Sequence, residues 1–146
     1  MLRQQTDSKL LLLAVALSAA AAVSLGVTRF AYGLLLPAMR EDLAWSYTLS
    51  GAMNTSNALG YFLGALATSR VIALWGPRRA LLWGGWLAAV LMCMPGFFVD
   101  PTVLIVQRLV AGMLSAVVFI SGGILAARMG SRQAERAGLI LGLYYG

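Results

Sequence analysis

Apolar residues are grouped into long runs along the chain, and short polar segments separate one run from the next. The first run covers residues 10–36, and later runs cover residues 48–74, 80–98 and 102–127. Each run is long enough for a transmembrane helix, because about 20 residues at ~1.5 Å each span a hydrocarbon core ~30 Å thick. The pattern therefore predicts an all-α, polytopic transmembrane helix bundle.

A fifth apolar run begins near residue 137 and holds about ten residues, or ~15 Å of helix. A helix that ends in the middle of a bilayer leaves backbone carbonyls without partners. We therefore expect residues 1–146 to form an incomplete N-terminal transmembrane bundle, with further spans of the same chain as its partners. The alternative for the first run is a signal peptide, since Lys9 precedes a Leu-rich segment and an alanine run at 19–22. The apolar character continues well past that alanine run, which favours a retained span.

Composition supports a membrane protein and excludes several other classes. The chain is 60% hydrophobic and 11% charged, so it lacks the charged surface of a soluble domain, and the lipid bilayer is its expected surrounding. The net charge of +6 comes from arginines that lie between apolar runs and form no basic face, which argues against nucleic-acid binding. With one cysteine, no histidine and five acidic residues, we expect no metal, no cofactor and no enzymatic centre.

The basic residues are distributed unequally between the two sides of the expected membrane. Three segments (the N-terminus, the link after the second run and the link after the fourth) hold Arg3, Lys9, Arg70, Arg78, Arg79, Arg128, Arg132 and Arg136. The other two links hold only Arg40. By the positive-inside rule, this asymmetry predicts a cytoplasmic N-terminus.

Two arginines, Arg29 and Arg108, lie inside apolar runs. A charge at this depth costs at least ~2.5 kcal/mol, and such residues usually face a protein interior or a water-filled path. Counted along a helix, Arg29 lies ~12 Å and Arg108 ~10 Å below the outer surface. Asn54 and Asn57 lie ~9–14 Å into the second run from the same side. These four residues are therefore predicted to form one layer in the outer half of the membrane.

Helical spacing predicts which polar residues share a face. One stripe of the second run carries Asn54, Asn57, Tyr61 and Thr68, with Gly60 and Gly64 nearby; one stripe of the fourth run carries Arg108, Gly112, Ser115 and Gly122. In the first run, Tyr32 and Gly33 follow Arg29 on its own face. We expect the first, second and fourth runs to line a wet interior, and the third to face lipid.

Each of these patterns has a structural alternative. Small residues at four-residue spacing permit close helix approach, and asparagines hydrogen-bond across helices, so packing explains Gly60, Gly64 and Gly112 and remains open for the asparagines. The arginines could pair with a carboxylate or with backbone carbonyls, but no Asp or Glu lies in any run. We favour a functional role for the arginines, and the predicted substrate-binding or coupling residues are Arg29, Tyr32, Asn54, Asn57, Tyr61 and Arg108.

Three segments resemble the major facilitator superfamily. The turn Gly76-Pro77-Arg78-Arg79 resembles the end of that family's Gly-x-x-x-Asp-Arg-x-Gly-Arg-Arg signature, although the aspartate is absent and an arginine, Arg70, lies upstream. Arg108-Leu-Val-Ala-Gly112 resembles its fourth-span Arg-x-x-x-Gly motif, which is associated with proton coupling. Residues 29–40 and 57–65 resemble the bacterial YbfB/YjiJ-type subgroup. The resemblance implies about twelve spans in a bacterial inner membrane, and a cytoplasmic gating loop at Arg70, Gly76, Arg78 and Arg79.

The resemblance implies a secondary active transporter that moves a small solute by alternating access. Arg29 and Arg108 would then act as counter-ions to an anionic substrate, or as modulators of a proton-carrying carboxylate elsewhere in the protein. The alternative is a small four-span membrane scaffold or assembly protein without transport activity, in which the arginines contact a partner subunit. A membrane-embedded enzyme is disfavoured, since a serine such as Ser115 has no base beside it.

Overall fold

Helices form almost the whole of the computed structural model, which describes the backbone of residues 2–146 and the side chains of residues 10–30 and 32–146. The elements, in chain order, are α1 (Leu2–Ala21), the π-helix η1 (Ala22–Ala31), α2 (Tyr32–Asp42), α3 (Tyr47–Cys93), the 3₁₀ turn η2 (Met94–Gly96), α4 (Pro101–Arg132), the 3₁₀ turn η3 (Ala134–Arg136) and α5 (Ala137–Tyr145). The predicted all-α class is confirmed. The side chains of Arg3 and Lys9, used above to predict orientation, lie outside those described.

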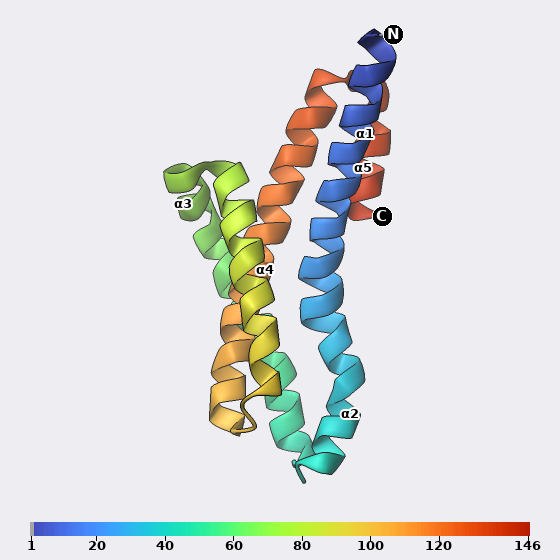
Figure 1. Cartoon of the computed structure of the whole chain (residues 1–146). Coiled ribbons are helices and arrows are strands. Elements are labelled where there is room, and N and C mark those ends of the chain that lie inside the picture. Colours follow the sequence, from blue (N-terminus) through green and yellow to red (C-terminus); the bar gives the residue numbers. More distant parts are fainter. Residues whose placement is uncertain (1) are drawn as a thin grey trace.

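The elements α1, η1 and α2 follow one another without a break and form a single long rod (Figure 1). The first apolar run ends at residue 36, just before Pro37, but α2 continues through this proline to Asp42. Proline removes one backbone hydrogen bond and leaves the carbonyl four residues earlier, on Gly33, without its helical partner. Membrane helices tolerate this where the freed group lines a cavity. Gly33 lines the polar pocket described below.

Helix α3 folds back on itself at Gly76, so that its two arms, residues 47–75 and 77–93, run in opposite directions (Figure 1). Gly76 has φ 76° and ψ 158°, a conformation that residues with a side chain rarely adopt, and Pro77 starts the second arm. Among the residues that the structure describes, three helical stretches can cross a membrane by length and composition: Leu10–Asp42, Tyr47–Gly96 and Pro101–Arg132. The second of these is the stretch that reverses at Gly76.

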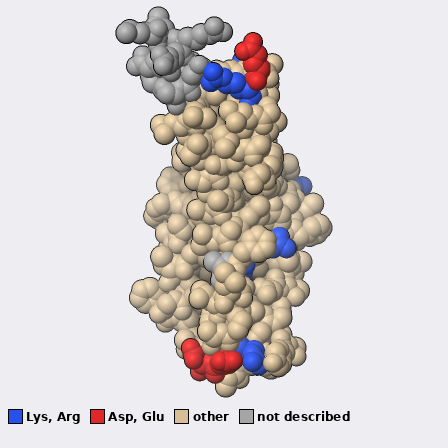
Figure 2. Space-filling model, turned by 90° about the vertical axis from the view of Figure 1, so that its right-hand side faces the viewer, with Lys and Arg blue, Asp and Glu red and all other residues tan. Residues whose placement is uncertain are grey.

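The links between helices gather toward the two ends of the bundle (Figure 1). The N-terminus, the bend of α3 and η3 lie toward one end, whereas residues 43–46 and 97–100 lie at the other. Side-chain caps start both helices at this second end. Ser46 accepts a hydrogen bond from the Leu49 amide at 3.1 Å, and Asp100 accepts from two amides of the first turn of α4, at 2.9 and 3.0 Å. Figure 2 shows charged side chains gathered near both ends of one face, with a broad, mostly uncharged band between them.

The first arm of α3 and helix α4 approach closely through glycines. A Cβ added at Gly60 or Gly64 would collide with the backbone of Leu109 or Met113 on α4. A Cβ added at Gly112 would collide with the backbone of Asn57 on α3. The contact is therefore one of backbone against backbone, the arrangement that small residues allow between membrane helices. It brings the polar residues of both helices to the same level of the bundle.

Candidate functional site

Arg108 is the most deeply buried charged side chain among those that the structure describes, with 1% of its surface exposed. Its Nη1 donates a hydrogen bond to the backbone carbonyl of Thr28 at 2.9 Å. The guanidinium carbon lies 3.9 Å from the centroid of the Tyr32 ring, in cation–π geometry. Helix α4 therefore supplies the charge, while the first rod supplies one acceptor and an aromatic face.

The other two nitrogens of this guanidinium, Nε and Nη2, have no hydrogen-bond partner among the described residues. The hydroxyl of Tyr32 is buried and also without a partner there. No acidic residue occurs between Asp42 and Asp100, or between Asp100 and Glu135, so no carboxylate of the apolar segments neutralises Arg108. A buried cation with an unused pair of donors is a site where an anion would be stabilised.

The backbone around Arg108 is held by side chains of α3. The Asn57 amide donates from Nδ2 to the Arg108 carbonyl at 3.0 Å, and the Ser56 hydroxyl donates to the Ile105 carbonyl at 2.8 Å. Asn57 is 4% exposed, so its bond is formed away from surface water. These contacts, together with the glycine contacts, set the position of α4 against α3.

A second set of polar contacts ties α4 to the π-helix. The hydroxyls of Ser115 and Thr28 lie 3.0 Å apart, and both donate to the carbonyl of Ser24. All three residues are buried, with 1–2% of their surface exposed. The tie lies about two helical turns from Arg108 along α4 and joins the same two elements.

We expect Ser115→Ala to weaken this tie modestly, because polar contacts between membrane helices average about 0.6 kcal/mol. The unfolding temperature of the purified chain, followed by tryptophan fluorescence, should fall slightly. Ser131→Ala is a suitable control, since the Ser131 hydroxyl is exposed and bonds only within its own helix, to the Arg128 carbonyl. Equal effects of the two substitutions would contradict a cross-helix role for Ser115.

Arg29 occupies a different environment from Arg108, although the two were predicted to share one layer. The Arg29 side chain is exposed and lines a pocket of about 450 Å³ between the first rod and the first arm of α3, together with Phe30, Gly33, Asn54, Thr55, Asn57 and Ala58. Tyr32, which was expected on the face of Arg29, packs under Arg108 instead. The reason is the π-helix at 22–31, whose wider turns rotate the residues that follow it away from α-helical spacing. Asn57 is the residue common to both environments.

The remaining predicted residues lie outside these contacts. Tyr61 is half-buried, and its backbone amide faces Gly112. In the predicted gating loop, Gly76 makes the turn of α3, while Arg70 and Arg79 are exposed. Arg78 lines a larger cavity, described next.

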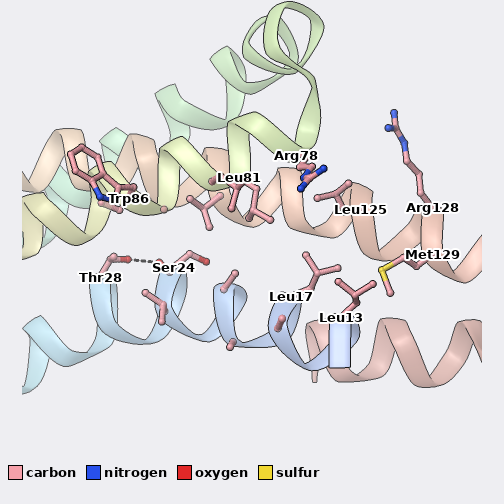
Figure 3. Close-up of a pocket in the computed structure, with 18 of the residues that line it drawn as sticks. Leu13, Leu17, Ser24, Thr28, Arg78, Leu81, Trp86, Leu125, Arg128 and Met129 are labelled. Atoms are coloured by element: carbon pink, nitrogen blue, oxygen red, sulfur yellow. Dashed lines mark hydrogen bonds between the residues drawn. The ribbon is translucent and has the colours of Figure 1, made fainter. Parts of the chain in front are cut away.

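The larger cavity has a volume of about 880 Å³ and is bounded by α1 and η1, the second arm of α3, and α4 (Figure 3). The third apolar run was expected only to face lipid, yet Leu81, Gly85 and Trp86 of that run form one wall. The expected single wet interior is therefore divided in two. A small pocket with polar residues lies between the first and second apolar segments, and a large apolar cavity lies between the first, third and fourth.

Sequence reasoning missed Thr28 and Ser24, which accept the bonds from α4. A signal was present, since Ser24, Thr28 and Tyr32 are spaced by four residues and so form one stripe. The acceptors themselves are backbone carbonyls, which have no signature in the sequence.

Comparison with known proteins identifies the family. No curated protein and no solved structure matches the chain. A family model described as an uncharacterised MFS-type transporter, YbfB, matches residues 21–146, which is most of the chain. This match confirms the resemblance inferred from the motifs. The chain, with its long apolar helices, therefore belongs to the YbfB-type family of major facilitator superfamily transporters and is a multi-pass membrane protein.

Proposed function

We propose that this transporter moves a small anionic solute by alternating access, and that Arg108 binds the negative group of that solute. The observation that carries the proposal is the buried guanidinium with two unused nitrogens. A charge in the membrane interior is retained at a cost of a few kcal/mol, which favours a functional role over an accidental one.

The geometry of the free edge favours a carboxylate or a similar planar anion. Nε and Nη2 lie on the same edge of the guanidinium, and arginine uses such an edge to bind a carboxylate through two parallel hydrogen bonds. Nη1 on the other side is already engaged by the Thr28 carbonyl, and the Tyr32 ring covers one face. The guanidinium is thus held in one orientation before a ligand arrives, which lowers the entropic cost of binding. The unpartnered Tyr32 hydroxyl is a further donor nearby.

Arg29 and its pocket would receive the rest of the solute. This pocket places a second guanidinium beside the amides of Asn54 and Asn57, and Asn57 also contacts the Arg108 backbone. We include Tyr61 in the proposed binding or coupling set because helical spacing places it on the same stripe of α3 as Asn54 and Asn57. A carboxylate that carries a proton would compete for Arg108, and proton coupling would operate through that exchange.

The membrane orientation belongs to the same proposal. Arg78 and Arg79 follow the bend of α3, and Arg128 and Arg132 belong to the last turns of α4. Both segments lie toward the end of the bundle that holds the N-terminus (Figure 1), whereas the opposite links hold Arg40. The positive-inside rule therefore supports a cytoplasmic N-terminus in a bacterial inner membrane, with Arg70, Gly76, Arg78 and Arg79 in a cytoplasmic gating loop.

A ligand panel tests the proposal. Small carboxylates, sulfonates and phosphates are each compared with their neutral amide or ester, and the unfolding temperature of the purified chain is measured at constant ionic strength. We expect at least one anion to stabilise the chain, by ~2.7 kcal/mol at a concentration 100 times its Kd, while its neutral partner does not. If no anion exceeds its neutral partner, anion binding at Arg108 is wrong. Uptake of an identified anion by proteoliposomes, with and without a proton gradient, then tests transport and coupling.

A further inference from the structure

The polar pocket between the first rod and the first arm of α3 holds hydrogen-bond acceptors as well as a guanidinium. The guanidinium is that of Arg29, which has no hydrogen-bond or ion-pair partner among the residues that the structure describes. Two of the acceptors, on Asn57 and Gly33, can be identified atom by atom. Together with Arg29, they restrict the kind of chemical group that the pocket can bind.

The first acceptor is the side-chain oxygen of Asn57. Its Nδ2 donates to the Arg108 carbonyl at 3.0 Å, and only the nitrogen end of an amide can face a carbonyl, so the orientation of this side chain is determined. The oxygen Oδ1 accepts no hydrogen bond from a described residue, yet it is not among the buried side-chain atoms that lack a partner. Oδ1 is therefore accessible, and Asn57 lines the pocket.

The second acceptor is the backbone carbonyl of Gly33. A glycine has no side chain, so Gly33 lines the pocket with its backbone. The residue four positions later in α2 is Pro37, which has no N–H. The Gly33 carbonyl therefore lacks the partner that a regular helix would supply, and it is available to a ligand. Pro37 itself is not part of the lining.

This combination of groups selects for a hydroxyl. A guanidinium only donates hydrogen bonds, and the oxygens of Asn57 and Gly33 only accept them. A carboxylate can pair with Arg29 but not with the two oxygens, whereas an ammonium can pair with the oxygens but is repelled by Arg29. The oxygen of a hydroxyl can accept from the guanidinium while its hydrogen is donated to a carbonyl oxygen. A hydroxyl is thus the simplest group that satisfies both sides of the pocket.

The pocket is adjacent to Arg108. The Nη1 atom of Arg108 lies 2.9 Å from the Thr28 carbonyl oxygen, and the same peptide group contains the backbone nitrogen of Arg29. By standard peptide dimensions, Nη1 is within ~5 Å of that nitrogen. Asn57 joins the two places from α3, because it contacts the Arg108 backbone and also lines the pocket. A molecule with only a few carbon atoms can therefore reach both.

We infer that the solute is a hydroxycarboxylate. Arg108 binds its carboxylate, and its hydroxyl lies in the pocket between Arg29 and the carbonyl oxygens of Asn57 and Gly33. The inference rests on the proposed function, from which it takes the anion site at Arg108. It adds a second recognition element that distinguishes one class of carboxylate from the others.

Four-carbon acids that differ in one group test the inference. The unfolding temperature of the purified chain is measured at constant ionic strength with butyrate, its 2-, 3- and 4-hydroxy derivatives, the corresponding aminobutyrates and the amide of each acid. The Kd values follow from the concentration dependence. We expect at least one hydroxy derivative to have a Kd at least ~fivefold lower than that of butyrate, as one or two added hydrogen bonds would produce. No aminobutyrate should bind more tightly than butyrate.

Replacing Pro37 with alanine removes one acceptor without adding an atom to the pocket. Alanine restores the N–H that pairs with the Gly33 carbonyl, and Pro37 is exposed, so we expect the fold to be retained. The preference for the hydroxy derivative should fall to about twofold in Pro37→Ala, while the Kd of butyrate stays unchanged. Pro101→Ala is the control, because Pro101 begins α4, where a proline frees no helical carbonyl. It should leave both Kd values unchanged.

The alternative outcomes separate this inference from the proposed function. If none of the acids binds more tightly than its amide, Arg108 does not bind a carboxylate and both are wrong. If butyrate binds more tightly than butyramide but no hydroxy derivative exceeds butyrate, the anion site stands and the hydroxyl site is wrong. Tighter binding of an aminobutyrate would overturn the selection for a hydroxyl. An undiminished preference in Pro37→Ala, or an equal loss in Pro101→Ala, would overturn the role of the Gly33 carbonyl.

Discussion

Replacing Arg108 with glutamine is expected to abolish anion binding and, at the same time, to leave the stability of the ligand-free chain almost unchanged. Binding is lost because the two free donors of the guanidinium edge, Nε and Nη2, disappear with the positive charge. Stability changes little because the cost of a buried cation with no counter-charge is offset by its contacts with the Thr28 carbonyl and the Tyr32 ring. The substitution thus separates a functional contribution from a structural one, since it affects binding and not stability.

The balance of free-energy terms supports this expectation. Placing a guanidinium in the membrane interior costs at least ~2.5 kcal/mol. Against this, Arg108 gains one hydrogen bond to the Thr28 carbonyl, about 0.6 kcal/mol between membrane helices, and a desolvated cation–π contact with Tyr32 of about 2 kcal/mol. The cost and the gains nearly cancel, so the neutral variant should have an unfolding temperature close to that of the parent chain, measured by tryptophan fluorescence.

Two controls sharpen the result. Arg40→Gln removes another arginine that lies over a tyrosine, 4.1 Å from the Tyr47 ring centroid, but at the end of α2. It should affect neither anion binding nor stability appreciably. Arg108→Lys keeps the charge without the planar edge, and we expect weakened rather than absent binding. A marked loss of stability in Arg108→Gln would show that the arginine is a structural tie, and would argue against its role as an anion site.

The second large effect is expected from Gly112→Leu. A Cβ at this position would collide with the Asn57 carbonyl and lie 2.8 Å from the Tyr61 amide nitrogen, both backbone atoms that no side-chain rotation can move away. Overpacking costs ~1–3 kcal/mol where side chains can adjust, so we expect a loss of about 3 kcal/mol here. The same displacement would break the bond from Asn57 to the Arg108 carbonyl, so anion binding should fall as well.

Gly51→Leu is the control, because nothing lies within 4 Å of a Cβ built at this position of the neighbouring helix α3. Both variants add the same side chain to a membrane helix and therefore change intrinsic helix propensity equally. Unfolding temperature and resistance to proteolysis should fall in Gly112→Leu alone. If the two variants behave alike, the close approach of α3 and α4 is not a determinant of stability.

The fold follows from features that can be recognised in the sequence. Apolar runs longer than 18 residues predict membrane helices, and Asp100-Pro101 and Gly76-Pro77 mark a helix start and a reversal that the structure also has. The ends of the helices were harder to predict from the sequence. Helix α2 continues through Pro37. Helix α4 extends to Arg132, so that Arg128 and Arg132 are helical rather than part of a link. A proline or a charged residue can belong to a helix when that part of the helix reaches a pocket or the interface.

The candidate site was predictable in its residues but not in its arrangement. Arg108, Asn57 and Tyr32 were all identified by polarity and depth, and they meet in the structure. Their grouping was inferred from 3.6-residue spacing, which does not hold through the π-helix, and so Tyr32 was assigned to the face of Arg29. The acceptor of the arginine is the main chain of Thr28, and every residue has the same main-chain carbonyl. Only the three-dimensional structure distinguishes it.

Because the acceptor of Arg108 is the main-chain carbonyl of Thr28, the surroundings of the arginine depend on backbone conformation. Since the Thr28 carbonyl lies within η1, the direction of the Arg108 guanidinium depends on the conformation of a ten-residue segment and not on the identity of one side chain. Conversion of this segment to regular α-helix would turn the carbonyl away from α4 and would rotate Tyr32 and the rest of α2 about the helix axis. The arginine would then lose its acceptor and its aromatic face in a single movement. Local rewinding of the first helix would thus change the surroundings of an arginine on the fourth, without any change in sequence.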